Sequence, residues 1–286
     1  MRGRDEFIEE VREWAAAEPG LHAALLVGSV ARSETPADEW SDVDIALIVD
    51  DPAPYLRDAA WLAPFGTPLL TFIEPTATGD SHERRVLFED GIEVDFAIFS
   101  AAAVERLRAD SGADSTLRRG YRVLVDRAGI ESLLDRPRSR EISVTDAAAL
   151  EQLANDVWYH ALWAAKKLRR GERWVARSCV DCYVHARLVE LTALHTQAFN
   201  AGVDTWHGGR FLERWAEEEV VAELWDSLVR EPDDIADAIR RSVALFDRLV
   251  DEAALRLGIR LDLRREDASV LLEKLLDTSV HQPPRP

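Results

Sequence analysis

The stretch LLVGSVARSETPADEWSDVDIALIV, residues 25–49, decides the fold. It contains the last three residues of one short apolar run, residues 21–27, and all of a second, residues 43–49. Both runs are rich in Leu, Ile and Val and predict buried strands. Gly28 and Ser29 close the first run, and Asp42 and Asp44 open the second. Because side chains alternate across a strand, the two aspartates point to the same side.

Two ionised carboxylates held so close repel each other and require a shared cation. Mg²⁺ fits because it prefers oxygen ligands, is often held by only one or two carboxylates, and completes its shell with water and substrate phosphates. A glycine after a strand lets the backbone approach a phosphate closely, and a helix start at Ser29 offers N–H groups and a hydroxyl to an anion. The stretch therefore predicts a joint metal and phosphate site.

A third acid lies in the clearest hairpin signal of the chain, RRVLFEDGIEVDFAIF, residues 84–99. Asp90 and Gly91 supply the tight turn between two alternating runs. Asp95 stands on a mostly apolar strand and joins Asp42 and Asp44 if that strand lies beside residues 43–49. Three acids around one or two metal ions activate an attacking oxygen and stabilise a leaving phosphate. Singly, these acids and the Gly-Ser pair are also compatible with an ordinary turn, loop or edge strand.

The sequence pattern changes after residue 135. Before that point, apolar runs of strand period alternate with short helices, which indicates an α/β domain over residues 1–135. From there the pattern is helical almost to the end, and the expected breaks lie near Gly171, Gly202, Gly208–Gly209, Pro232 and Gly258. We predict a helical bundle over residues 136–280, its first helix capped by Ser143 or Thr145.

The composition excludes several classes of partner. A formal net charge of −18 disfavours nucleic acid and anionic membranes, because phosphate binding needs clustered Lys and Arg. No apolar run approaches the roughly 20 residues of a membrane span, and residues 1–10 lack the apolar segment of a secretory signal. We expect a cytoplasmic protein that attracts cationic ligands. Cys179 and Cys182 lack a second C-x-x-C, so we expect both to pack inward rather than bind metal.

The Gly-Ser loop, the Asp-x-Asp strand and the third Asp resemble the nucleotidyltransferase superfamily, which includes DNA polymerase β and the antibiotic nucleotidyltransferases. More narrowly, three segments in order resemble the aminoglycoside 6-adenylyltransferase (streptomycin adenylyltransferase) family: WLAPFG at residues 61–66, VLFEDGIEVDFAIF at 86–99 and YRVLVDRAG at 121–129. The helical part adds LWAAKKL at 162–168 and GGRFLERW at 208–215. The family commonly has Gly-Ser-Arg, and Val30 stands here in place of the arginine.

The resemblance implies a polymerase-β-like nucleotidyltransferase domain with a mixed sheet, followed by a helical substrate-binding domain. It implies that Asp42 and Asp44 bind Mg²⁺, that Gly28 and Ser29 hold the triphosphate of ATP, and that Asp95 is the general base or a third metal ligand. Lys166 and Arg177 would reach the phosphates from the helical domain. The implied reaction moves AMP to a hydroxyl of a cationic aminoglycoside, and we expect a monomer.

Two alternatives to this reaction stay open. One is a nucleotidyltransferase for a lincosamide or another small molecule, with the same catalytic face and a different helical pocket. The other is a regulatory, antitoxin-like nucleotidyltransferase module that acts on a protein.

Overall fold

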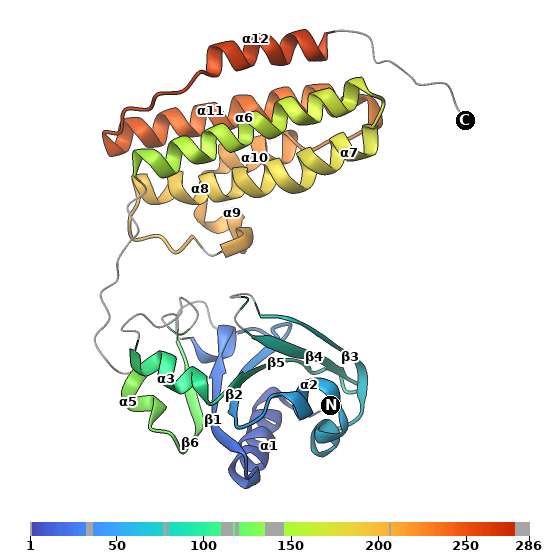
Figure 1. Ribbon diagram of the computed structural model, residues 1–286, viewed down its shortest axis with the longest axis vertical. Helices are drawn as coiled ribbons and strands as arrows, with labels where there is room; N and C mark the ends of the chain where they lie inside the picture. Colours follow the sequence, from blue (N-terminus) through green and yellow to red (C-terminus); the bar gives the residue numbers. More distant parts are fainter. Residues whose placement is uncertain are drawn as a thin grey trace. The chain divides into compact units, whose positions relative to one another are not determined.

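A computed structural model describes residues 2–32, 37–76, 79, 81–109, 117, 120–134, 146–205 and 207–277. The chain separates into two compact units, Met1–Arg140 and Glu141–Pro286, and each is described by itself (Figure 1). The expected boundary between residues 135 and 136 lies outside the described residues.

The first unit is built on a six-stranded sheet with the order β3-β4-β5-β2-β1-β6. Neighbouring strands are antiparallel except β2 and β5, which run parallel, so the sheet is mixed as expected. The hairpin predicted around Gly91 is β4 and β5, and Gly91 has a φ of +89° in its turn. The strands are β1 (Leu21–Val27), β2 (Val43–Val49), β3 (Pro68–Pro75), β4 (His82–Phe88), β5 (Glu93–Ser100) and β6 (Arg122–Asp126).

Apolar side chains cover both faces of the central strands. One face packs on α1 and the short helices α2 and η2, with a core of aromatic rings that includes Phe7, Phe65 and Phe96. The other face packs on α3 and α5 through residues such as Ile48 and Ile130. Burial on both faces explains why β1 and β2 read as continuous apolar runs. These helices are α1 (Arg4–Ala17), η1 (Gly28–Ala31), α2 (Ala53–Arg57), η2 (Ala60–Phe65), α3 (Ala102–Ala109) and α5 (Ile130–Leu134).

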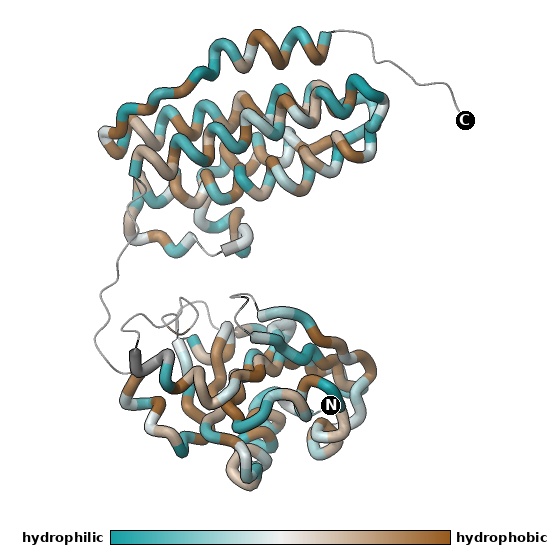
Figure 2. Tube along the Cα trace, in the orientation of Figure 1, coloured by the Kyte–Doolittle hydropathy of each residue, from teal (hydrophilic) through white to brown (hydrophobic). Residues whose placement is uncertain are grey.

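The second unit is helical. Apolar positions recur along α6, α8 and α11 with a helical period, which Figure 2 shows as alternating colours, and they meet in one core. The helices are α6 (Ala147–Arg169), α7 (Arg173–Ser178), a π-helical turn (Cys179–Val184), α8 (His185–Phe199), η4 (His207–Gly209), α9 (Leu212–Trp215), α10 (Glu218–Asp226), η5 (Pro232–Asp234), α11 (Ile235–Leu257) and α12 (Arg265–Leu276).

Two local predictions in this unit need correction. The N-cap of α6 is Asp146, whose side chain accepts a hydrogen bond from the Ala149 N–H at 2.8 Å. Ser143 and Thr145, the expected caps, lie outside the described residues. Cys179 is buried as expected, but Cys182 is exposed. Among the helices that the structure describes, none is long and apolar enough to cross a membrane.

Candidate active site

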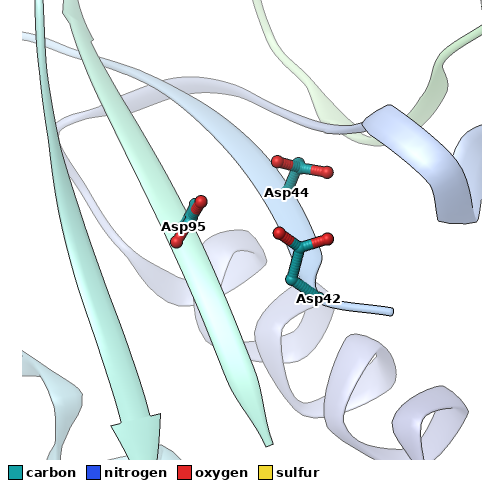
Figure 3. A group of neighbouring side chains, drawn as sticks. All are labelled: Asp42, Asp44 and Asp95. Atoms are coloured by element: carbon teal, nitrogen blue, oxygen red, sulfur yellow. The ribbon is translucent and has the colours of Figure 1, made fainter. Parts of the chain in front are cut away.

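Strand pairing brings the three aspartates together. In the parallel register of β2 and β5, Asp44 lies directly beside Asp95, as the sequence prediction required. Asp42 comes just before β2 and its carboxylate turns toward the same place (Figure 3). One carboxylate oxygen from each of the three lies within 4.8 Å of the others. Asp95 is 4% exposed, whereas Asp42 and Asp44 are half-buried.

The two oxygens of Asp95 have different surroundings. Arg85, on the neighbouring strand β4, places its Nη2 2.9 Å from Asp95 Oδ2. The buried Oδ1 has no hydrogen-bond partner. Burial raises the pKa of Asp95 to about 7; the Arg85 guanidinium opposes this shift, and the negative charge of Asp44 adds to it. Asp95 is thus a carboxylate that can take up a proton near neutral pH.

The turn after β1 approaches Asp44 more closely than any side chain would allow. Val27, the last residue of β1, is opposite Asp44 in the antiparallel register. Gly28 follows with a φ of +68°, and a Cβ placed there would lie 1.8 Å from Asp44 Oδ2 and 2.6 Å from Asp44 Cγ. Ser29 is next in the four-residue 3₁₀ turn, and its Oγ is buried without a hydrogen-bond partner. The glycine therefore brings the backbone and a hydroxyl beside the carboxylates.

Val30, which stands where the resemblance led us to expect arginine, has a structural role. Its side chain is half-buried and packs against the core beneath the sheet. Arg32 supplies a cation to the same turn, because its Nε donates to the Gly28 carbonyl oxygen at 3.0 Å. This hydrogen bond from the residue that follows the turn stabilises the turn's conformation.

Lys166 and Arg177 both belong to the second unit, where their surroundings differ. Lys166 is exposed on α6, while its neighbour Lys167 is bound to Glu172 at 2.7 Å and lies 5.1 Å from the Trp163 ring centre. Arg177 donates to Asp181 Oδ2 at 3.0 Å. These two residues are the cations expected at the phosphates. In the part of the chain that the structure describes, Arg177 pairs with a carboxylate of its own helical unit, whereas Lys166 extends from an exposed position.

The sequence prediction missed a charged network beside Asp95. Arg85 Nε lies 2.6 Å from Glu74 Oε1 on β3 and 3.1 Å from Glu83 Oε1 on β4. The alternation in HERRVLF already sets Glu83 and Arg85 on the face opposite Val86 and Phe88. Their relation to Asp95, however, depends on the register between β4 and β5.

The donor set fits a hard divalent cation. It consists of carboxylate oxygens, the ligands that Mg²⁺ prefers. The orphaned Asp95 Oδ1 indicates a missing partner, since buried polar atoms are nearly always satisfied. Within the described ranges, this is the one group of three or more acidic, His or Cys side chains that lies close enough to share an ion.

Gly28→Ala is expected to remove activity while leaving a folded protein. A methyl group at Gly28 would displace the Asp44 carboxylate, and the left-handed backbone costs roughly 1–2 kcal/mol for a residue with a Cβ. Gly258→Ala is the matched control, because its φ of +67° imposes the same backbone cost and nothing lies within 4 Å of its Cβ position. Thermal unfolding should show similar losses for both variants, and turnover should fall only in Gly28→Ala. Equal turnover in the two would contradict the close approach.

Asp95→Asn is expected to change the pH dependence of stability. The folded-state pKa of about 7 lies above the value of roughly 3.9 for an unfolded aspartate, so the folded state binds this proton more tightly. The free energy of unfolding contributed by Asp95 is therefore highest at low pH and falls as the pH rises from about 4 to 7. Melting temperatures in EDTA should show Asp95→Asn more stable than the wild type at pH 8 and similar at pH 4. A variant without this gain at pH 8 would refute the burial argument.

Comparison with known proteins gives a family match across both units. The sequence model of the family described as streptomycin adenylyltransferase matches residues 1–272. An aminoglycoside 6-adenylyltransferase of Bacillus subtilis (strain 168) is 23% identical over 249 residues, which cover 80% of this chain and 86% of that protein.

Similar solved structures include two bacterial proteins. The crystal structure of an aminoglycoside 6-adenyltransferase from Bacillus subtilis gives a TM-score of 0.45 at 17% identity, covering 97% of this chain and 100% of that one. A nucleotidyltransferase-like protein from Exiguobacterium sibiricum 255-15 gives 0.36 at 15% identity, covering 90% and 77%.

Proposed function

We propose, because this chain belongs to the streptomycin adenylyltransferase family, that it transfers AMP from ATP to a hydroxyl of a streptomycin-like aminoglycoside and releases pyrophosphate. Family membership makes the chain a nucleotidyltransferase. The observation that carries the proposal is the meeting of three carboxylates within 4.8 Å beside the Gly28 turn. That arrangement suits phosphoryl chemistry, in which positioning and charge stabilisation supply most of the catalysis.

In this reaction the acceptor oxygen forms a bond to the α-phosphorus of ATP, and the bond between that phosphorus and the pyrophosphate oxygen breaks. The hydroxyl proton passes to Asp95 Oδ1, the oxygen that Arg85 does not hold. A carboxylate with a pKa of about 7 is a better base than an ordinary aspartate, and near neutral pH a substantial fraction of it is ionised and able to accept a proton. Asp95 is therefore proposed as the general base.

The remaining groups bind the nucleotide. Asp42 and Asp44 would hold Mg²⁺, which when bound offsets the negative charge of the triphosphate and of the leaving pyrophosphate. The backbone at Gly28 and the Ser29 hydroxyl would donate hydrogen bonds to phosphate oxygens. Lys166 and Arg177 are proposed to reach the phosphates from the second unit, which we assign as the substrate-binding domain.

The acceptor class agrees with the charge of the protein. Aminoglycosides are polycations, and a net charge of −18 raises their local concentration near the protein. The same charge opposes nucleic-acid acceptors. Because ATP is the proposed co-substrate, we also propose a cytoplasmic enzyme.

A pyrophosphate-release assay with Mg²⁺ and ATP tests the proposal across acceptors. The panel contains streptomycin, a second aminoglycoside, a lincosamide and a reaction without acceptor. We expect release with streptomycin and none without acceptor or with the lincosamide. Pyrophosphate release only with the lincosamide would show that lincosamides, not aminoglycosides, are the acceptors. No release with any acceptor would favour a regulatory module that acts on a protein.

A further inference from the structure

A strip of side chains crosses the sheet from Asp95 to the outer strand. In the strand register, Asp95 on β5 is opposite Arg85 on β4, and Arg85 is opposite Phe72 on β3. Side chains two positions away along each strand share this face. We name as the edge strip the six residues Leu70, Phe72, Glu74, Glu83, Arg85 and Asp95.

The edge strip carries more negative than positive charge. Arg85 is within 3.1 Å of three carboxylates, those of Glu74, Glu83 and Asp95, and so leaves the group with a net charge of −2 when all three are ionised. The half-buried Glu83 also has a raised pKa because burial disfavours its charged form. Asp95 Oδ1, buried and without a hydrogen-bond partner, ends the strip at the catalytic carboxylates. An incoming cation would relieve this excess of negative charge.

Next to these acids the strip presents apolar surface to solvent. Phe72 is 53% exposed and Leu70 is 63% exposed, although both lie on the same face as the ion pairs. A sugar ring offers apolar C–H groups that pack on such surface, and its amino substituents are attracted to an aromatic face. Exposed aromatic and aliphatic groups beside carboxylates are thus a combination that suits an amino sugar.

The order of strands assigns the two substrates to different sides of the carboxylates. The Gly28 turn follows β1, on one side of β2, whereas Asp95 and the edge strip lie on β5, β4 and β3, on the other. If the phosphates bind at the turn, the acceptor hydroxyl must approach Asp95 from the side of the edge strip, because a base acts only within hydrogen-bond reach.

We propose that the edge strip is an acceptor subsite, in which Phe72 and Leu70 contact a sugar ring and Glu74 pairs with its amino or guanidino groups. This inference rests on the proposed function and deepens it, because it names residues of the catalytic unit that select a polycationic acceptor. Phe72 and Glu74 are specificity-determining residues, while Arg85 positions Asp95 and the two glutamates.

Steady-state kinetics of three variants test the subsite. Phe72→Ala and Glu74→Gln should each raise the KM for streptomycin about tenfold, equivalent to about 1.4 kcal/mol, and leave the KM for ATP unchanged. Ile73→Ala is the matched control, because Ile73 pairs with Arg84 and lies on the opposite face of the same strand. It should match the wild type in both constants. The streptomycin KM should also respond less steeply to salt in Glu74→Gln than in the wild type.

Two results would overturn the subsite and leave the proposed function intact. One is an unchanged streptomycin KM in both variants. The other is an equal rise in the KM for ATP, which would assign the strip to the nucleotide instead of the acceptor. If the wild type transfers no AMP to streptomycin, the proposed function fails, and calorimetric titration with streptomycin then decides the subsite. Weaker binding to Phe72→Ala than to wild type and Ile73→Ala would support it. Equal binding, or none, would refute it.

Discussion

Asp95→Asn is expected to lower kcat for AMP transfer by about 10²–10⁴-fold, the range that a positioned general base contributes. The asparagine side chain has nearly the same shape but cannot take the hydroxyl proton. Because Asp42 and Asp44 keep their carboxylates, binding of Mg-ATP should remain detectable by calorimetry. Single-turnover kinetics measured beside that titration separate the chemical step from binding.

Glu89→Gln is the control for Asp95→Asn. Glu89 is exposed in the turn between β4 and β5, so its replacement removes one negative charge from the same hairpin without touching the three aspartates. It should keep wild-type turnover. Undiminished turnover in Asp95→Asn would eliminate Asp95 as the base, and loss of Mg-ATP binding in that variant would make it a metal ligand instead.

Asp44→Asn is expected to abolish the dependence of ATP binding on Mg²⁺ and to reduce turnover by at least about 10³-fold, because charge stabilisation by a bound metal is worth several kcal/mol. Asp44 lies directly beside Asp95 on β5 and next to the Gly28 turn after β1, so its loss removes one of the three carboxylates that share the site. Calorimetric titration of ATP with Mg²⁺ and with EDTA measures the effect directly. The wild type should bind far more tightly with Mg²⁺.

Asp50→Asn provides a comparison just beyond the other end of β2. Asp50 follows the last residue of β2, at the end away from Asp44, and its exposed carboxylate pairs with His22 at 2.6 Å. An exposed pair of this kind contributes little to stability. This variant should bind Mg-ATP like the wild type. If Asp44→Asn also retained wild-type Mg-ATP affinity, the ligand assignment would be wrong.

Much of the fold could be predicted because its signals are local. The apolar run of residues 43–49 and the Asp90–Gly91 turn depend on neighbours in sequence, and they appear as β2 and the β4–β5 hairpin. The meeting of Asp44 with Asp95 is different, because it depends on a parallel pairing between strands separated by two others in the chain. The sequence therefore predicts a three-acid site only if the strand that carries Asp95 lies beside residues 43–49. The register of β2 and β5 shows that it does.

The features that sequence analysis missed depend on contacts across several strands or on the choice between equivalent residues. Arg85 reaches Asp95 on one side and Glu74 on the other, which follows only from the positions of three strands. Ser, Thr and Asp are all good N-cap residues, so residue type pointed to Ser143 or Thr145, whereas the hydrogen bond from the Ala149 N–H identifies Asp146 as the N-cap of α6. Similarly, Lys166 and Lys167 are adjacent in sequence but point to different sides of α6. Lys167 pairs with Glu172, and Lys166 is exposed.

The fate of the label in ATP tests the central claim most directly. The wild-type protein is incubated with streptomycin, Mg²⁺ and ATP labelled at the α-phosphate or at the γ-phosphate, and the products are separated and weighed by mass spectrometry. Adenylyl transfer predicts that the α-label enters the antibiotic, which gains one AMP group, and that the γ-label leaves in pyrophosphate. Label from the γ-phosphate in the antibiotic, or α-label found only in unreacted ATP or on the protein itself, would contradict the account.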